Sequence, residues 1–191
     1  MNIGLLGVDY NRASLQEIEK IYINKDSLQS FLDSFSLLPN IKEWVILSTC
    51  NRMEIYFYAD NLGNAFQCLK SQVSAFKQVP ISFVEKICMQ LEDRDVVNHL
   101  FSVASGIKSM VFGEYEILGQ VKTAYQNSLD QQLSGPVLNK VFQAAIAAGK
   151  RVRSETNISR GAYSVSSIAI ESIREQFLDY FDKRILDRKS T

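Results

Sequence analysis

Residues 44–58 read WVILSTCNRMEIYFY, two apolar, β-rich runs joined by a short polar segment. The pattern predicts two strands that meet at a turn carrying Cys50 and, two residues later, Arg52. A cysteine on a turn is accessible to a reactant, and a neighbouring guanidinium favours the nucleophilic thiolate. We therefore interpret Cys50 as a candidate nucleophile. The alternative, a buried cysteine that acts as a small hydrophobic residue, fits poorly with the polar Asn51 and Arg52 that follow.

The rest of the chain divides into two kinds of pattern. The first 92 residues alternate between strand-like and helical stretches, and from residue 93 onward the pattern is helical. We expect strands at residues 3–8, 43–48, 53–58 and 84–89. We expect helices at 14–21, 26–38, 64–76, 93–104 (capped by Asp93), 115–129 and 138–153, and a long one from 164 toward 186.

These elements predict an α+β fold: a small mixed sheet with flanking helices, then a helical subdomain, then the start of a long connecting helix. We assign residues 1–160 to one domain, with an α+β half at 1–92 and a helical half at 93–160. Residues 161–191 are assigned to the connecting helix. A chain of 191 residues is long enough for such a domain with a sizeable core.

Charge balance and cysteine usage exclude several classes of protein. The 21 basic and 21 acidic side chains give zero net charge, which argues against a general nucleic-acid coat protein and leaves room for a local basic strip. Three cysteines without CxxC spacing and a single histidine argue against a disulfide framework and a metal site. The chain lacks a signal-peptide pattern and any window long enough to span a bilayer. We therefore expect a cytoplasmic protein without a metal.

His99 is the only histidine in the chain. Its imidazole has the unperturbed pKa that suits proton transfer near neutrality, which makes it a candidate acid or base. The alternative is a polar residue at the edge of an apolar helix face.

A second candidate region spans residues 102–122. Three glycines interrupt it beside short polar or acidic side chains: the glycines are Gly106, Gly113 and Gly119, and the polar residues are Ser109, Glu114, Glu116 and Gln120. Helix breaks at glycines let the backbone approach a ligand closely. The alternative is a helix–loop–helix corner with a capping glutamate. The region is not a phosphate-binding loop, since neither GxxxxGK nor GxGxxG occurs in the chain.

A third cluster is basic. Residues 150–153 read KRVR, with Lys140 upstream and Arg160 downstream. Such a strip can contact RNA phosphates, and basic residues at the end of a helix also stabilise the helix dipole. Charge alone leaves both interpretations open.

Five motifs, taken together and in order, resemble those of glutamyl-tRNA reductases. They are STCNRMEIY at 48–56, HLFSVASG at 99–106, SMVFGEYEILGQVK at 109–122, KRVRSET at 150–156 and SVS at 164–166. The motifs span most of the chain, and five in register are far more specific than a cysteine with a distant histidine. The chain is thus identified as resembling the catalytic, substrate-recognition domain of this family.

The resemblance implies a reaction. Cys50 would attack the ester that joins glutamate to tRNA, forming a thioester and releasing the tRNA. NADPH would then reduce the thioester to glutamate-1-semialdehyde, the first committed step of porphyrin and other tetrapyrrole biosynthesis by way of 5-aminolevulinate. The resemblance also implies glutamyl-tRNA as a partner, the downstream aminomutase as a second candidate partner, and a homodimer for a full-length protein.

The resemblance also implies roles for side chains. Thr49, Asn51 and Arg52 would line the glutamyl pocket, with Arg52 gripping a substrate carboxylate. His99 would handle protons or orient the ester. The positions that match the family's other substrate contacts are Ser109, Glu114, Tyr115, Glu116 and Gln120.

The chain departs from the family pattern at several positions. Tyr10 and Ser14 stand where the family has histidine and proline, and Met53 stands where threonine is common. Glu116 replaces the usual glutamine, which adds negative charge near an anionic substrate. This charge either weakens glutamate binding or is neutralised by a nearby lysine, Lys108 or Lys122.

The family's nucleotide-binding domain and its dimerisation helices are not expected within these 191 residues, so we expect no NADPH site here. The chain by itself would form the thioester without reducing it. Two other hypotheses remain: a truncated, non-catalytic module that binds glutamyl-tRNA or a regulator, and a structural helical protein with an incidental thiol.

Overall fold

A four-stranded sheet lies at the centre of the domain in the computed structural model, which describes residues 2–35, 40–159 and 165–177. The strand order is β2-β3-β1-β4, and all three neighbouring pairs are antiparallel. The strands are β1 Ile3–Asp9, β2 Ile41–Thr49, β3 Arg52–Ala59 and β4 Met89–Glu92. All seven residues of β1 are buried, as expected for a strand covered on both faces.

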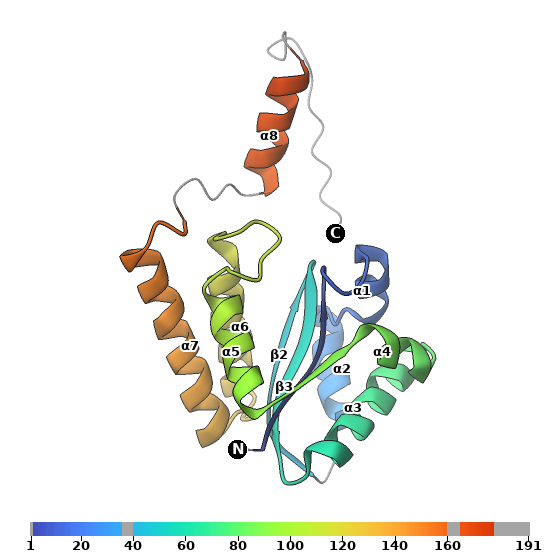
Figure 1. Cartoon of the computed structure of the whole chain (residues 1–191). Coiled ribbons are helices and arrows are strands. Elements are labelled where there is room, and N and C mark those ends of the chain that lie inside the picture. Colours follow the sequence, from blue (N-terminus) through green and yellow to red (C-terminus); the bar gives the residue numbers. More distant parts are fainter. Residues whose placement is uncertain (1, 36–39, 160–164, 178–191) are drawn as a thin grey trace.

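Helices from the two halves of the chain cover opposite faces of this sheet (Figure 1). One face carries α1 Leu15–Ile21, α2 Lys25–Phe35, α3 Leu62–Lys77 and α4 Ile81–Ile87. The other face carries α5 Asp93–Ala104, α6 Glu116–Asp130 and α7 Pro136–Glu155. The helix α8 spans Val165–Gln176. None of the helices in the described residues is long and apolar enough to cross a membrane.

The two-residue period of β3 decides which side chains meet the helical half. Met53, Ile55 and Phe57 belong to the core beneath α1–α4. The intervening Tyr56 belongs to the core beneath α5–α7. Since alternate side chains of a strand share a face, Arg52 and Glu54 point to the same side as Tyr56, toward α5.

The α+β fold class and the hairpin around Cys50 are confirmed, while three finer predictions are wrong. The sheet is antiparallel throughout and not mixed. The strand expected at 84–89 is α4, with the short β4 after it. The run is too short for its period to decide between helix and strand, and Val84 and Ile87 are buried on one helical face three residues apart. The N-cap of α5 is Glu92, and the Asp93 carboxylate accepts a hydrogen bond from Ile3 N at 3.1 Å.

Two helix predictions extend beyond the described residues. The helix expected at 26–38 is α2, and positions 36–38 lie outside the description. The long connecting helix corresponds to α8 as far as Gln176, and its expected continuation from residue 178 also lies outside the description. The predicted domain boundaries stay a prediction.

Candidate active site

Cys50 lies at the tip of the β2–β3 hairpin, in a two-residue turn that joins Thr49 to its cross-strand partner Arg52. The turn is held in two ways. Asn51 N donates to Thr49 Oγ1 at 3.2 Å, and Tyr10 N donates to Asn51 O at 3.1 Å. The hairpin therefore presents an exposed thiol on a backbone that is held by the Thr49 side chain and by Tyr10, the residue after β1.

The thiol lines a pocket between the hairpin tip and the segment that leads from α5 into α6. The lining residues are Thr49, Cys50, Asn51, Arg52, Ser109, Met110, Glu114, Glu116, Ile117 and Gln120. Eight of the ten predicted site residues are among them. In the part of the chain that the structure describes, the two predicted residues outside this lining are His99 and Tyr115. Met110 and Ile117 were not predicted, because an apolar side chain carries no sequence signal that separates a pocket wall from a core.

Two glycines shape the segment between α5 and α6. Gly106 and Gly113 have φ angles of 81° and 77°, in the left-handed region. Gly113 N donates to Gly106 O at 3.0 Å, which closes the loop. A Cβ on Gly113 would collide with the carbonyl oxygen of Ile158. The helix break predicted from these glycines is therefore a tight loop that only glycine permits.

Arg153 and Tyr10 tie this loop to the rest of the domain. Arg153 Nη1 donates to Ala104 O at 2.8 Å, and Arg153 Nη2 donates to Glu114 O at 2.7 Å. Tyr10 Oη donates to Ser109 O at 3.0 Å. Arg153 thus serves as an internal clamp, with both terminal nitrogens of its guanidinium paired inside the domain. Tyr10, one of the departures from the family pattern, has a structural role here.

A buried ionic network lies behind the pocket, centred on the fully buried Glu54. Its Oε1 accepts from Arg52 Nη1 at 2.8 Å and lies 2.8 Å from His99 Nε2, while Oε2 accepts from Tyr56 Oη at 2.6 Å. Arg52 Nη2 donates to the carbonyl of Lys108. Every side chain of this group except that of Lys108 is buried, so the network is fixed as a unit.

The network holds Glu54 as a carboxylate. Burial by itself raises the pKa of Glu54, but the Arg52 charge and the hydrogen bonds from His99 and Tyr56 outweigh burial and lower that pKa to about 2. The same burial, together with the neighbouring carboxylate, raises the pKa of Tyr56 well above its usual value. Near neutral pH this site therefore contains a Glu54 anion, an Arg52 cation and a neutral tyrosine.

His99 is fixed by partners on both ring nitrogens. Lys108 Nζ lies 3.3 Å from His99 Nδ1. An ammonium is only a donor, so Nδ1 accepts and the ring proton sits on Nε2, where it is donated to Glu54. His99 is a buried residue of α5 that reaches the pocket only through Glu54 and Arg52. Its side-chain hydrogen bonds are with Glu54 and Lys108, and it does not line the pocket itself. Lys108, one of the two lysines considered as neutralising Glu116, instead contacts this ring.

The electrostatic environment of Cys50 differs from the prediction. Burial of the sulfur by neighbouring atoms raises the pKa of the Cys50 thiol, and the carboxylates of Glu114 and Glu116 raise it further. The prediction that Arg52 favours the thiolate is wrong, because the guanidinium is turned toward Glu54 and the Lys108 carbonyl. At neutral pH the unliganded thiol is protonated.

Fold and site together define a class: an α+β domain with an exposed cysteine at a polar pocket whose lining includes both an arginine and two glutamates. A family model described as "Glutamyl-tRNAGlu reductase, N-terminal domain" matches residues 6–156. The chain belongs to the glutamyl-tRNA reductase family, and the resemblance noted in the sequence is confirmed.

Individual relatives agree with this assignment. The chain is 37% identical over 185 residues to a glutamyl-tRNA reductase of Rippkaea orientalis, covering 97% of this chain and 43% of that protein. It is 39% identical over 171 residues to that of Acaryochloris marina, covering 90% of this chain and 40% of that protein. The solved glutamyl-tRNA reductase of Methanopyrus kandleri matches with a TM-score of 0.71 and 31% identity, over 92% of this chain and 40% of that one. The chain thus spans about two fifths of the length of these relatives.

Proposed function

We propose that this chain is the part of a glutamyl-tRNA reductase that binds the glutamyl group of glutamyl-tRNA and transfers it to Cys50. The observation that supports this function best is an exposed thiol over a pocket with opposite charges on its walls. Arg52 is a cation at one wall, and Glu114 and Glu116 are anions at the other. An esterified glutamyl group carries an α-ammonium and a side-chain carboxylate, so its charges complement those walls.

Arg52 keeps hydrogen-bonding capacity for a ligand. Its guanidinium has five N–H donors, of which Glu54 and the Lys108 carbonyl take one each. The Arg52, Glu54 and Lys108 side chains sum to one positive charge, which is the balance needed to receive a carboxylate. Thr49, Asn51, Ser109 and Gln120 contribute neutral polar groups to the same pocket.

The transfer step forms one bond and breaks one. Cys50 Sγ attacks the ester carbonyl carbon, the carbon–oxygen bond to the tRNA ribose breaks, and the thiol proton ends on the departing ribose oxygen. A substrate ammonium placed beside Glu114 and Glu116 offsets the negative charges that hold the pKa of Cys50 up. Substrate binding therefore favours the Cys50 thiolate, which is the form that attacks the ester.

The described residues do not form the usual dinucleotide-binding fold. Dinucleotide folds use parallel strands and a glycine-rich turn that opens a helix, whereas every strand pair of the described sheet is antiparallel. The proposal for this chain therefore ends at the thioester. Reduction by NADPH, a homodimer, contact with the aminomutase and a cytoplasmic location remain predictions for the whole protein.

Trapping the acyl-enzyme tests the proposal. We expect acid quenching after incubation with glutamyl-tRNA to reveal a mass increase of one glutamyl group on a peptide containing Cys50. The adduct should disappear in Cys50→Ala and persist in the matched control Cys68→Ala. If the wild-type chain carries no adduct while the tRNA stays charged, the proposal is wrong.

The alternative of a non-catalytic binding module is favoured by one observation, the raised pKa of Cys50. Such a module would bind glutamyl-tRNA with equal affinity in the wild type and in Cys50→Ala and would form no adduct. The same experiment, with tRNA binding measured in parallel, therefore separates the two functions.

A further inference from the structure

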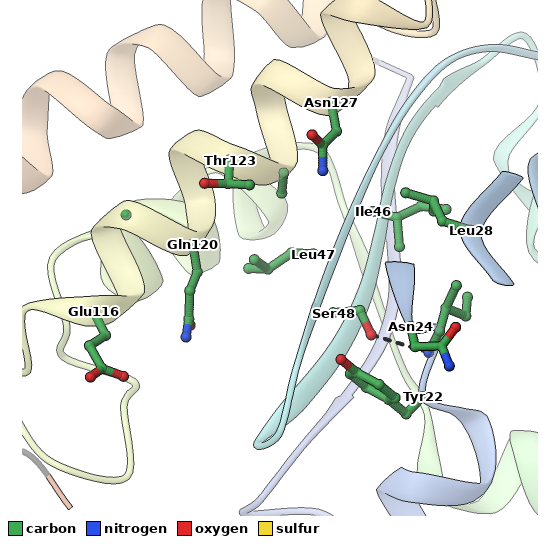
Figure 2. Close-up of a pocket in the computed structure, with 13 residues that line it drawn as sticks. Tyr22, Asn24, Leu28, Ile46, Leu47, Ser48, Glu116, Gln120, Thr123 and Asn127 are labelled. Atoms are coloured by element: carbon green, nitrogen blue, oxygen red, sulfur yellow. Dashed lines mark hydrogen bonds between the residues drawn. The ribbon is translucent and has the colours of Figure 1, made fainter. Parts of the chain in front are cut away.

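A second cavity, of about 460 Å³ (Figure 2), shares the lining residues Glu116 and Gln120 with the Cys50 pocket. Its walls are α6 on one side and the segment from Tyr22 to Leu28 on the other, with the strand β2 between them. This volume lies within the range of roughly 300–1,000 Å³ that is typical of small-molecule sites. None of its lining residues has a place in the acyl-transfer step except Glu116 and Gln120.

The strand β2 offers main-chain groups to this cavity. It is an edge strand of the described sheet. Trp44 N donates to Leu133 O at 2.9 Å, so the main chain of Trp44 faces away from β3. Since the direction alternates along an antiparallel strand, the N–H and C=O groups of Ile46 and Ser48 face the same way. Both residues line the cavity, which therefore presents donors and acceptors along one wall.

The side chains of the cavity suit a neutral, aromatic and polar ligand. Its lining contains no lysine or arginine, which disfavours a phosphate. Tyr22 contributes a half-buried aromatic ring. The side-chain amides of Gln120 and Asn127 have no hydrogen-bond partner within the described residues, and both point from α6 toward β2 (Figure 2). Unpaired bases at RNA ends are recognised by such stacking surfaces and polar groups.

The cavity adjoins the Cys50 pocket. Glu116 and Gln120, one helical turn apart on α6, line both spaces. A ligand whose acyl carbon meets Cys50 therefore has room to extend past these side chains toward β2. In glutamyl-tRNA the group joined to that carbon is the ribose of the terminal adenosine.

We propose that this cavity binds the terminal adenosine of glutamyl-tRNA, with the base against Tyr22 and its polar edge on the main chain of Ile46 and Ser48. The assignment rests on the proposed function for the identity of the ligand. The phosphates of the acceptor end lie outside the cavity. The absence of lysine and arginine from its lining is therefore compatible with this ligand. An extended peptide added to the β2 edge is the competing occupant.

Two esters distinguish failure of this site from failure of the proposed function. The rate of Cys50 acylation is measured with glutamyl-tRNA and with glutamate α-methyl ester, which lacks the nucleoside. We expect Tyr22→Ala and Asn127→Ala to slow acylation by glutamyl-tRNA about 5- to 30-fold, as for loss of base stacking or a base contact. Acylation by the methyl ester should be unchanged. Gln126→Ala, an exposed neighbour on α6 that does not line the cavity, is the matched control and should change neither rate.

Each outcome decides one claim. Equal effects of Tyr22→Ala on both esters, or no effect on either, overturn the adenosine site. If neither ester acylates Cys50, the proposed function fails, and the site is then judged by NMR titration with adenosine. Adenosine should shift the amide signals of Ile46 and Ser48 in the wild type and not in Tyr22→Ala. Shifts caused only by an extended peptide would assign the β2 edge to a protein partner and overturn the site.

Discussion

The charge of Glu54 stabilises the folded domain, and the structure gives the size and the pH window of that effect. The pKa of this carboxyl is lowered from 4.5 to about 2. At about 1.4 kcal/mol per pKa unit, the charged form contributes roughly 3 kcal/mol to the free energy of unfolding. Because the pKa is lower in the folded state, the contribution is fully present above pH 4.5 and is lost as the pH falls toward 2.

Replacing Glu54 by glutamine tests this directly. Glu54→Gln leaves the buried Arg52 cation without its partner, so we expect a loss of about 3–5 kcal/mol at pH 7. The difference in stability between wild type and variant should shrink by about 3 kcal/mol between pH 4.5 and pH 2. Urea unfolding at a series of pH values, followed by the fluorescence of Trp44, the single and buried tryptophan, measures both quantities.

Tyr56→Phe is the matched control for this experiment. It removes the hydrogen bond to Glu54 Oε2 and keeps the carboxylate, so we expect a loss of about 1.5–3 kcal/mol at pH 7. Most of the acid dependence should remain, and its midpoint should move to higher pH. The reasoning is refuted if Glu54→Gln follows the wild-type pH dependence in parallel, because the charge of Glu54 would then contribute nothing.

Three further predictions concern the thiols and the helix packing. Glu116→Gln should lower the pKa of Cys50, because it removes a negative charge that destabilises the thiolate. Alkylation of Cys50 by iodoacetamide should become a few-fold faster at pH 7.5, and the pH dependence of the alkylation rate measures the pKa. Burial raises the pKa of Cys88 to about 12, so mass spectrometry after alkylation should find it unmodified until denaturant is added. Gly149→Ala should destabilise the domain by about 1–3 kcal/mol in urea unfolding, since the new Cβ would lie 2.6 Å from Ala104 O. Unchanged stability would mean that α5 and α7 can move apart at no cost in free energy.

The sequence predicted the pocket well because most of its residues lie in two short segments. Thr49, Cys50, Asn51 and Arg52 are neighbours on one hairpin, and two apolar, β-rich runs joined by a short polar segment identify a hairpin without tertiary information. The polar residues near Gly106 and Gly113 form the facing wall, at a break that glycine alone indicates. Local pattern together with the resemblance to the reductases therefore named residues in both of the segments that line the pocket.

The sequence did not predict the direction in which each side chain points. Arg52 follows Cys50 by two residues, which suggested an effect on the thiol, yet its partner is Glu54. The Glu54 site exists because β3 places three alternate polar side chains beneath α5, where His99 meets them. The strand wrongly predicted at 84–89 has a similar cause. The run is too short for its sequence to distinguish a helix from a strand, and the packing of Val84 and Ile87 makes it a helix.

The amino-acid sequence alone determined the family, the hairpin that carries Cys50 and the glycine-bounded loop opposite it, because these depend on residue order and backbone preference over a few neighbours. Only the tertiary structure decided that His99 is buried in a network behind the pocket, that Arg153 clamps a loop, and that a cavity lies along the edge of β2. Those facts depend on which groups a fold brings within hydrogen-bond distance across 40 or more residues of chain, and burial then decides which charges must be paired.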